Sequence, residues 1–297
     1  MNKIRNQIFK GAATALITPF KNGKIDFEAF ENLIEFQVES GISALVVCGT
    51  TGEASTMDYE EQLSCIKFAV EKAKGRLPIV AGTGSNCTKK AIYLSEKACE
   101  LGADALLIIT PYYNKATPDG LINHFTKIAD SVKKPIIMYN VPARTGVSIP
   151  LEVYKVLSDH ENIVGVKEAS GNLSGIASLL AECGDKLAVY SGNDDQTLPI
   201  LALGGSGVVS VVSNILPHKM QDLCNRFFER DIDSACEIQL QLLDIINAMF
   251  CEVNPIPIKY AMSLMSLCSD ELRLPLTVPC EKSKAKIREI LKCYNLI

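Results

Sequence analysis

The sequence predicts an α/β fold, a (β/α)8 or TIM barrel with a C-terminal helical extension, on three observations. Eight short apolar runs recur at intervals of roughly 20 to 35 residues, which is the spacing of successive strand–helix units. Each run is apolar throughout rather than alternating, as expected of parallel strands that are covered on both faces. The segments between the runs begin with acidic residues and close on glycine or lysine, which is typical of helices.

The eight predicted strands account for most of the first 230 residues. They are the runs at residues 11–18, 43–49, 78–83, 105–110, 135–140, 163–169, 187–193 and 207–213. Two of the intervening helices have clear boundaries, since one begins at Asp26 and ends at Gly41, and the next begins at Asp58 and ends at Gly75. Eight such units predict a closed barrel.

An open, doubly wound sheet is the alternative architecture, and it would need a nucleotide-binding fingerprint. The nearest approach to one is GTGSNC at residues 82–87, which has Cys87 where a third glycine is required. From Asp231 onward the pattern changes to helical segments without strands. We therefore predict a catalytic barrel over residues 1–230 and a helical region over residues 231–297.

Composition indicates a globular protein with a sizeable core, because 47% of the residues are hydrophobic and 22% are charged. The net charge of −4 and the lack of a basic block argue against nucleic acid or a membrane as a partner. The apolar run after the basic N-terminus is short and lacks a convincing cleavage site, so we interpret it as a strand rather than a signal peptide. These features predict a cytoplasmic protein.

The eleven cysteines do not suggest a disulfide framework, because their number is odd and no C-x-x-C occurs. Small apolar thiols in a reducing cytoplasm are the simpler interpretation. The three histidines, His124, His160 and His218, share no ligand spacing with the cysteines, so no metal site is expected.

Lys167 ends the apolar run of the sixth predicted strand, IVGVKEAS. Catalytic groups of such a barrel project from the carboxyl ends of its strands, and a poorly solvated lysine amine there can condense with a carbonyl to form a Schiff base. A lysine that extends to solvent or pairs with Glu168 is the alternative. Strand alternation places Glu168 on the opposite face, which disfavours the pair.

Tyr139 ends the neighbouring strand, where its phenol could carry protons to and from an imine formed on Lys167. The motif GTTGE at residues 49–53 could hold a carboxylate through backbone amides and the hydroxyls of Thr50 and Thr51. Arg144 offers a second carboxylate ligand. Together these groups predict an aldolase-type reaction between a 2-oxo acid and a second acidic substrate, and no motif for a metal or a cofactor accompanies them.

Four motifs, GTTGE, PYYNK, MYNVPARTG and GVKEASG, resemble the signature blocks of the dihydrodipicolinate synthase family of pyruvate-dependent class I aldolases. The resemblance extends through nearly the whole chain. It implies that Lys167 forms an imine with pyruvate, so that no separate cofactor is needed. It further implies addition to L-aspartate 4-semialdehyde and cyclisation to 4-hydroxy-tetrahydrodipicolinate, the first committed step of diaminopimelate and lysine biosynthesis.

The resemblance also assigns roles to individual residues. It implies a proton relay of Tyr139, Thr50 and Tyr113, with Tyr113 supplied by a neighbouring subunit. A homo-oligomer is therefore expected, at least a dimer and commonly a tetramer built as a dimer of dimers. It implies that Thr51 binds the pyruvate carboxylate and that Arg144 shapes the site of the second substrate. Gly192 and Val209 are implied to line the pyruvate pocket.

Two rival functions remain at this point. N-acetylneuraminate lyase and related sugar-acid aldolases share the fold, the lysine and the tyrosine, but they resemble GSTGE and usually lack the arginine of VPART. Thr50 and Arg144 therefore favour the synthase. The second rival is a catalytically silent barrel that acts as a binding protein or regulator. The intact set of Lys167, Tyr139 and Thr50 disfavours it.

Feedback inhibition by L-lysine is the property for which the sequence departs from the family. Asn86 and Tyr112 match the inhibitor site of lysine-sensitive members, whereas Tyr59 and Gln62 stand where histidines often occur. Lys90 replaces a glutamate that would meet the inhibitor's amine, and two cations in a confined site repel each other. We expect weak or absent inhibition by L-lysine.

Overall fold

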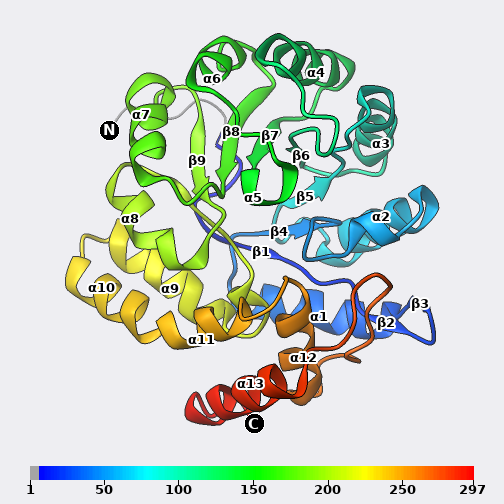
Figure 1. The fold of residues 1–297 in the computed structure, drawn as a ribbon, viewed down its shortest axis with the longest axis vertical. Coiled ribbons are helices and arrows are strands. Elements are labelled where there is room, and N and C mark those ends of the chain that lie inside the picture. Colours follow the sequence, from blue (N-terminus) through cyan, green and yellow to red (C-terminus); the bar gives the residue numbers. More distant parts are fainter. Residues whose placement is uncertain (1–6) are drawn as a thin grey trace.

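The computed structural model describes residues 7–297, and its centre is a closed barrel of parallel strands surrounded by helices (Figure 1). The strands neighbour one another in the order β1–β10–β9–β8–β7–β6–β5–β4. Their bounds are β1 Gly11–Ala15, β4 Ala44–Val47, β5 Ile79–Gly82, β6 Ala105–Ile109, β7 Ile136–Asn140, β8 Ile163–Glu168, β9 Ala188–Ser191 and β10 Gly207–Ser210. Each coincides with one predicted strand, so the (β/α)8 prediction is confirmed.

A short hairpin that the sequence did not predict follows β1. Strand β2 (Phe20–Lys21) pairs antiparallel with β3 (Lys24–Ile25), and strands of two residues are too short to show a periodic pattern. The backbone amides of Asn22 and Gly23, at its tip, donate to the Glu271 carboxylate at 2.8 and 2.6 Å. The hairpin is thus joined to the C-terminal part of the chain.

The helices that follow the strands surround the barrel and bury one face against it, except α5, a single turn over the end of β7 (Figure 1). They are α1 Phe27–Glu39, α2 Tyr59–Ala73, α3 Thr88–Glu100, α4 Pro118–Ser131, α5 Pro142–Thr145, α6 Leu151–Leu157, α7 Leu173–Cys183, α8 Thr197–Ala202 and α9 Pro217–Phe228. The predicted starts at Asp26 and Asp58 are confirmed as N-caps. Asp58 and Glu61 form a reciprocal capping box.

Two hydrophobic layers hold the barrel together. The outer layer lies between the strands and the helices, and the inner one fills the barrel with small residues such as Ala13 and Ala44 together with Tyr139, Tyr190 and Val209. At the amino end of the strands, the ring of Phe9 stacks on Tyr190 with centroids 4.1 Å apart, and the Tyr190 hydroxyl donates to the Phe9 carbonyl at 2.8 Å. The amino end of the barrel is therefore packed.

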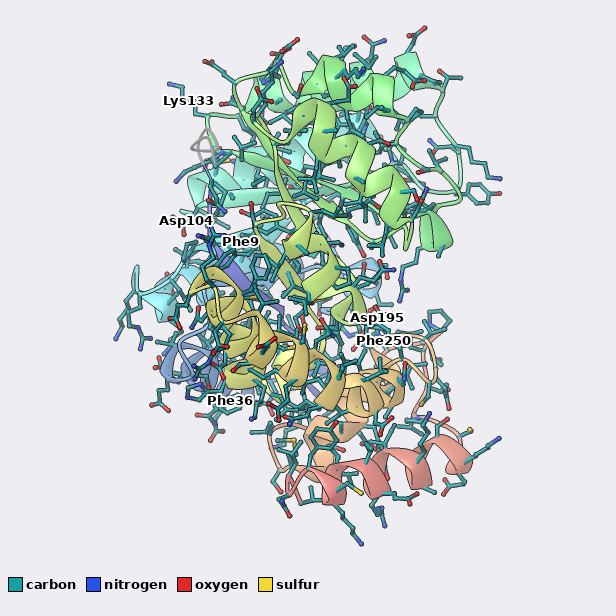
Figure 2. All side chains as sticks on the ribbon, turned by 90° about the vertical axis from the view of Figure 1, so that its left-hand side faces the viewer. Phe9, Phe36, Asp104, Lys133, Asp195 and Phe250 are labelled. Atoms are coloured by element: carbon teal, nitrogen blue, oxygen red, sulfur yellow. The ribbon has the colours of Figure 1, made fainter. Side chains whose placement is uncertain are left out.

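Figure 2 separates the two ends of the barrel. Phe9, Asp104 and Lys133, which precede β1, β6 and β7, lie on one side, whereas Asp195, which follows β9, lies on the other. Phe250, from the C-terminal part of the chain, lies on the same side as Asp195. The C-terminal part therefore reaches the end of the barrel where the catalytic groups are expected.

After β10 the described chain contains only helices, namely α9, α10 (Ile232–Gln241), α11 (Leu243–Met249), α12 (Ile256–Leu264) and α13 (Glu281–Cys293). Helix α10 packs on α9, while α13 packs on α11 and α12. The change to helices at Asp231 agrees with the predicted pattern. The division into two domains at that residue stays a prediction.

Two further features bear on expectations from the sequence. Across residues 7–297, none of the helices has both the length and the apolar composition required to cross a membrane. All eleven cysteines are free thiols. Four of them are buried, as expected of small apolar cysteines, namely Cys48, Cys65, Cys183 and Cys224, whereas the other seven are partly or fully exposed.

Candidate active site

Lys167 and Tyr139 lie side by side at the carboxyl end of the barrel. They are direct partners in the register of β8 and β7, and both are buried, with 6% and 7% of their surface exposed. The Lys167 Nζ lies 4.4 Å from the centroid of the Tyr139 ring. The tyrosine face thus provides a cation–π contact for the ammonium form of the lysine. The predicted juxtaposition of amine and phenol is confirmed.

Glu168, the next residue, points away from Lys167. Its carboxylate accepts hydrogen bonds from Asn140 Nδ2 at 2.9 and 3.1 Å, from the Tyr154 hydroxyl at 3.1 Å and from the Ser170 amide at 2.8 Å. Burial, followed by the Glu168 charge, raises the pKa of Tyr154 well above its usual value. The predicted opposite orientation is confirmed, so Glu168 is not the partner of the Lys167 amine.

Residues 49–53, which we call the carboxylate cradle, form a tight turn after β4. The Glu53 amide donates to the Thr50 carbonyl at 3.1 Å, and Thr18 Oγ1 donates to the Gly52 carbonyl at 2.7 Å. Glu53 has a left-handed backbone conformation, with φ at 53°. Thr50 is half-buried and Thr51 is buried.

Asn254 joins two of the predicted substrate ligands, and no sequence pattern indicated it. Its Nδ2 donates to Thr51 Oγ1 at 3.0 Å, and its carbonyl accepts from Arg144 Nη2 at 3.1 Å. The side chain is 7% exposed, and its Oδ1 is buried with no hydrogen-bond partner in the described chain. An unpaired acceptor beside Thr51 and Arg144 makes Asn254 a further candidate for substrate contact.

Arg144 lies on α5, the short helix after β7, and its side chain is exposed. Tyr113 follows β6 in a left-handed conformation with φ at 73°, and 91% of its surface is exposed. Within the described residues of this one chain, no hydrogen bond joins Tyr113 to Tyr139 or Thr50. Its placement at the surface accords with a role in a neighbouring subunit.

Gly192 directly follows β9, and Val209 lies on β10. The Gly192 amide donates to the Glu168 carbonyl at 2.7 Å, and a Cβ at Gly192 would lie 2.6 Å from the Ala169 Cβ, so glycine alone fits. Val209, 1% exposed, belongs to the same interior cluster as Tyr139. That these two positions bind substrate stays a prediction.

Asp194 is a second residue that the sequence did not single out, although SGNDD follows the seventh predicted strand. Its carboxylate is 1% exposed, accepts a short hydrogen bond from the Ser210 hydroxyl, and accepts another from the Val211 amide at 3.0 Å. Burial raises the pKa of Asp194, whereas these donors and the Lys167 charge lower it. This carboxylate joins the loop after β9 to the end of β10.

Tyr59 and Gln62 lie on α2 and Lys90 lies on α3. At these three positions the sequence departs from the inhibitor site of lysine-sensitive family members. The Gln62 side chain is turned into the structure, where its Nε2 donates to the carbonyls of Ala54 and Met57 at 2.9 and 3.1 Å. The Tyr59 ring lies 5.9 Å from that of Tyr93, and Lys90 is exposed on α3. The Gln62 amide is therefore already satisfied internally.

Residues 7–297 contain no group of three or more His, Cys, Asp and Glu side chains arranged to hold a metal ion. A lysine amine against a tyrosine, at the carboxyl end of a (β/α)8 barrel and beside a threonine-lined turn, is the arrangement expected of lyases that work through an imine.

Comparisons with known proteins specify the class further. The model of the dihydrodipicolinate synthetase family matches residues 8–294. A 4-hydroxy-tetrahydrodipicolinate synthase of Alkaliphilus oremlandii is 49% identical over 290 residues, which cover 98% of this chain and 100% of that protein. The chain belongs to the dihydrodipicolinate synthetase family.

Solved structures agree with this assignment. The chloride-inhibited dihydrodipicolinate synthase from Acinetobacter baumannii, complexed with pyruvate, has a TM-score of 0.96 and 41% identity, covering 98% of this chain and 100% of that one. A monomeric dihydrodipicolinate synthase variant has a TM-score of 0.96 and 40% identity, covering 98% of each chain. The resemblance seen in the motifs is confirmed over the whole chain, and the chain is an enzyme of this family.

Proposed function

We propose that this enzyme condenses pyruvate with L-aspartate 4-semialdehyde to give 4-hydroxy-tetrahydrodipicolinate, the first committed step toward diaminopimelate and lysine. The observation that carries the proposal is the buried Lys167 amine, 4.4 Å from the centre of the Tyr139 ring at the carboxyl end of the barrel. The family membership, the names of the relatives and the pyruvate bound to the Acinetobacter baumannii structure support the choice of substrates.

The first half of the reaction forms the imine. The neutral Lys167 amine attacks the ketone of pyruvate, and the resulting carbinolamine loses water to give the iminium. Tyr139, with Thr50 and the Tyr113 of a neighbouring subunit, moves the protons that this step requires. The carboxylate cradle and Thr51 bind the pyruvate carboxylate, so that the ketone carbon faces Lys167. Val209 and Gly192 leave space for the methyl group.

The second half forms the carbon–carbon bond. Loss of a proton from the methyl group of the iminium gives an enamine, whose carbon adds to the aldehyde of the second substrate. The amino group of that substrate then attacks the iminium carbon and displaces the Lys167 amine, which closes the ring. Arg144 binds the carboxylate of the second substrate, because a guanidinium holds a carboxylate through two parallel hydrogen bonds. One water is released overall, and no metal or separate cofactor is needed.

The assembly we propose is at least a dimer, with a tetramer built as a dimer of dimers expected. The exposure of Tyr113, at 91%, supports a role outside its own chain. One similar structure is described as a monomeric variant, so assembly is not uniform among relatives. We place the enzyme in the cytoplasm, because four of its free cysteines, Cys87, Cys236, Cys280 and Cys293, are exposed, and exposed thiols persist in a reducing compartment.

Product formation tests the proposed substrates. With pyruvate present, L-aspartate 4-semialdehyde should be consumed to give the cyclic product, while N-acetylmannosamine should give no condensation product. The variant Arg144→Lys should raise the KM for the semialdehyde and leave the KM for pyruvate unchanged, because lysine cannot form the paired hydrogen bonds. Turnover of N-acetylmannosamine in preference to the semialdehyde would contradict the proposal.

A further inference from the structure

Glu53 is the one charged residue of the carboxylate cradle, and the proposed chemistry gives it no role. Its side chain is turned away from Lys167 into the interface with the C-terminal helices. Glu53 Oε1 accepts from Lys259 Nζ of α12 at 2.5 Å, and both side chains are completely buried. Glu53 Oε2 accepts from the Arg273 amide at 3.1 Å. Both carboxylate oxygens are thus bound by residues 231–297.

Lys259 has no route to solvent, so its charge depends on Glu53. Burial lowers the pKa of Lys259, and the Glu53 carboxylate opposes this. The Lys259 Nζ also lies 4.2 Å from the centroid of the fully buried Phe20 ring, and the Arg273 guanidinium lies 4.3 Å from the same centroid. Lys259, Arg273, the Phe20 ring and the Glu53 carboxylate thus form a compact cluster, in which Arg273 alone is partly exposed.

Arg273 connects this cluster to α2 and to the β2–β3 hairpin. Its guanidinium binds Glu61 on α2 through two hydrogen bonds of 2.6 Å and donates to the Thr56 carbonyl at 3.1 Å. It also donates to the Gly23 carbonyl of the β2–β3 hairpin at 2.9 Å. The segment from the cradle to the start of α2 is therefore fixed from the C-terminal side at several points.

The backbone of Glu53 is part of the cradle itself. Its amide closes the turn on the Thr50 carbonyl, and its carbonyl accepts from Thr56 Oγ1 at 3.0 Å. Its left-handed conformation is unfavourable for a residue other than glycine and persists only when the surroundings enforce it. Movement of the Glu53 side chain would consequently shift the amides and hydroxyls of residues 50 and 51.

We propose that Glu53, clamped by Lys259 and Arg273, is a positioning residue that keeps the carboxylate cradle in the shape that binds the substrate carboxylate. The inference rests on the proposed function, since it requires the cradle to hold pyruvate. It makes the C-terminal helical region a working part of the active site. Asn254, from the same region, also donates to the Thr51 hydroxyl. The C-terminal helical region therefore contacts the cradle at both Thr51 and Glu53.

The test measures the pyruvate concentration that gives half-maximal borohydride trapping on Lys167, together with the maximal trapping rate and the Tm. The variants Glu53→Gln and Lys259→Met should each raise that concentration about tenfold, because the cradle loosens. The maximal rate should change less than threefold, because Lys167 and Tyr139 are untouched. The expected effect is therefore on binding of the carboxylate rather than on the chemistry of the amine.

Loss of stability must be separated from loss of positioning. A single substitution leaves one buried charge without a partner, whereas the double variant Glu53→Gln/Lys259→Met removes both charges and should recover most of the Tm. Its half-saturating pyruvate concentration should stay raised about fivefold or more. If the single variants do not fold, the half-saturating pyruvate concentration of the double variant tests the proposal.

The matched control is Leu291→Ala, which opens a cavity in the fully buried core of α13. It should lower the Tm while leaving the half-saturating concentration within twofold of wild type. The proposal is overturned if a folded Glu53 or double variant also stays within twofold, or if Leu291→Ala raises the concentration as much. Failure of the wild-type enzyme to trap pyruvate at all would instead contradict the proposed function.

Discussion

His124 gives a quantitative prediction about stability and pH. Its ring is 4% exposed on α4, its Nδ1 is 2.9 Å from Thr88 Oγ1, and its Nε2 has no hydrogen-bond partner in the described chain. Burial lowers the pKa of His124 from 6.5 to about 4. Protonation would therefore bury a charge with one N–H unsatisfied.

The sign follows from which state binds the proton more readily. Between pH 6.5 and 4 the unfolded chain binds more protons at this residue than the folded chain, so stability is lost as the pH falls through this window. The full difference of 2.5 pH units corresponds to about 3 kcal/mol. At pH 4.5 roughly 2.5 kcal/mol of this would already be lost.

The variant His124→Gln isolates this effect. At pH 7.5 it should be less stable than wild type by about 1 kcal/mol, since the hydrogen bond to Thr88 is weakened. At pH 4.5 the order should reverse, because the glutamine does not titrate. Urea unfolding at both pH values measures the two differences, with the exposed His218→Gln as control. An equal difference at both pH values would refute the reasoning.

Three further predictions concern the site and its regulation. Tyr139→Phe should lower kcat by about 100-fold or more while pyruvate can still be trapped, because the proton carrier is lost; a normal kcat would exclude the relay. Tyr113→Phe should lower activity to the same extent as splitting the dimer, as seen by sedimentation and assay together, and a fully active monomer would contradict this. L-lysine at millimolar concentration should leave the initial rate unchanged, because Lys90 is a cation and Gln62 is bonded internally; marked inhibition would refute the expectation.

The sequence was sufficient for the features that depend on local pattern. Continuous apolar runs located every barrel strand, and strand order then placed Tyr139 beside Lys167. Alternation along β8 also separated Lys167 from Glu168 correctly. These predictions are correct because the apolar pattern of a strand and the residue at its end lie within a few positions of each other in the sequence.

The features that were missed depend on contacts far apart in the chain. Asn254 reaches Thr51 across 203 positions, and Lys259 reaches Glu53 across 206. No local sequence pattern around Asn254 or Lys259 predicts these contacts, because they depend on how the C-terminal helices pack on the barrel. The motifs shared with the family likewise lie at the strand ends, whereas Lys259 lies on α12.

The proposed mechanism depends on an imine between Lys167 and pyruvate. The most direct measurement treats the enzyme with pyruvate and borohydride, and then locates the added mass by digestion and mass spectrometry. We predict a single reduced pyruvate adduct on Lys167, absent without pyruvate and absent in Lys167→Ala. No adduct, or an adduct on another lysine with Lys167 unmodified, would contradict the account.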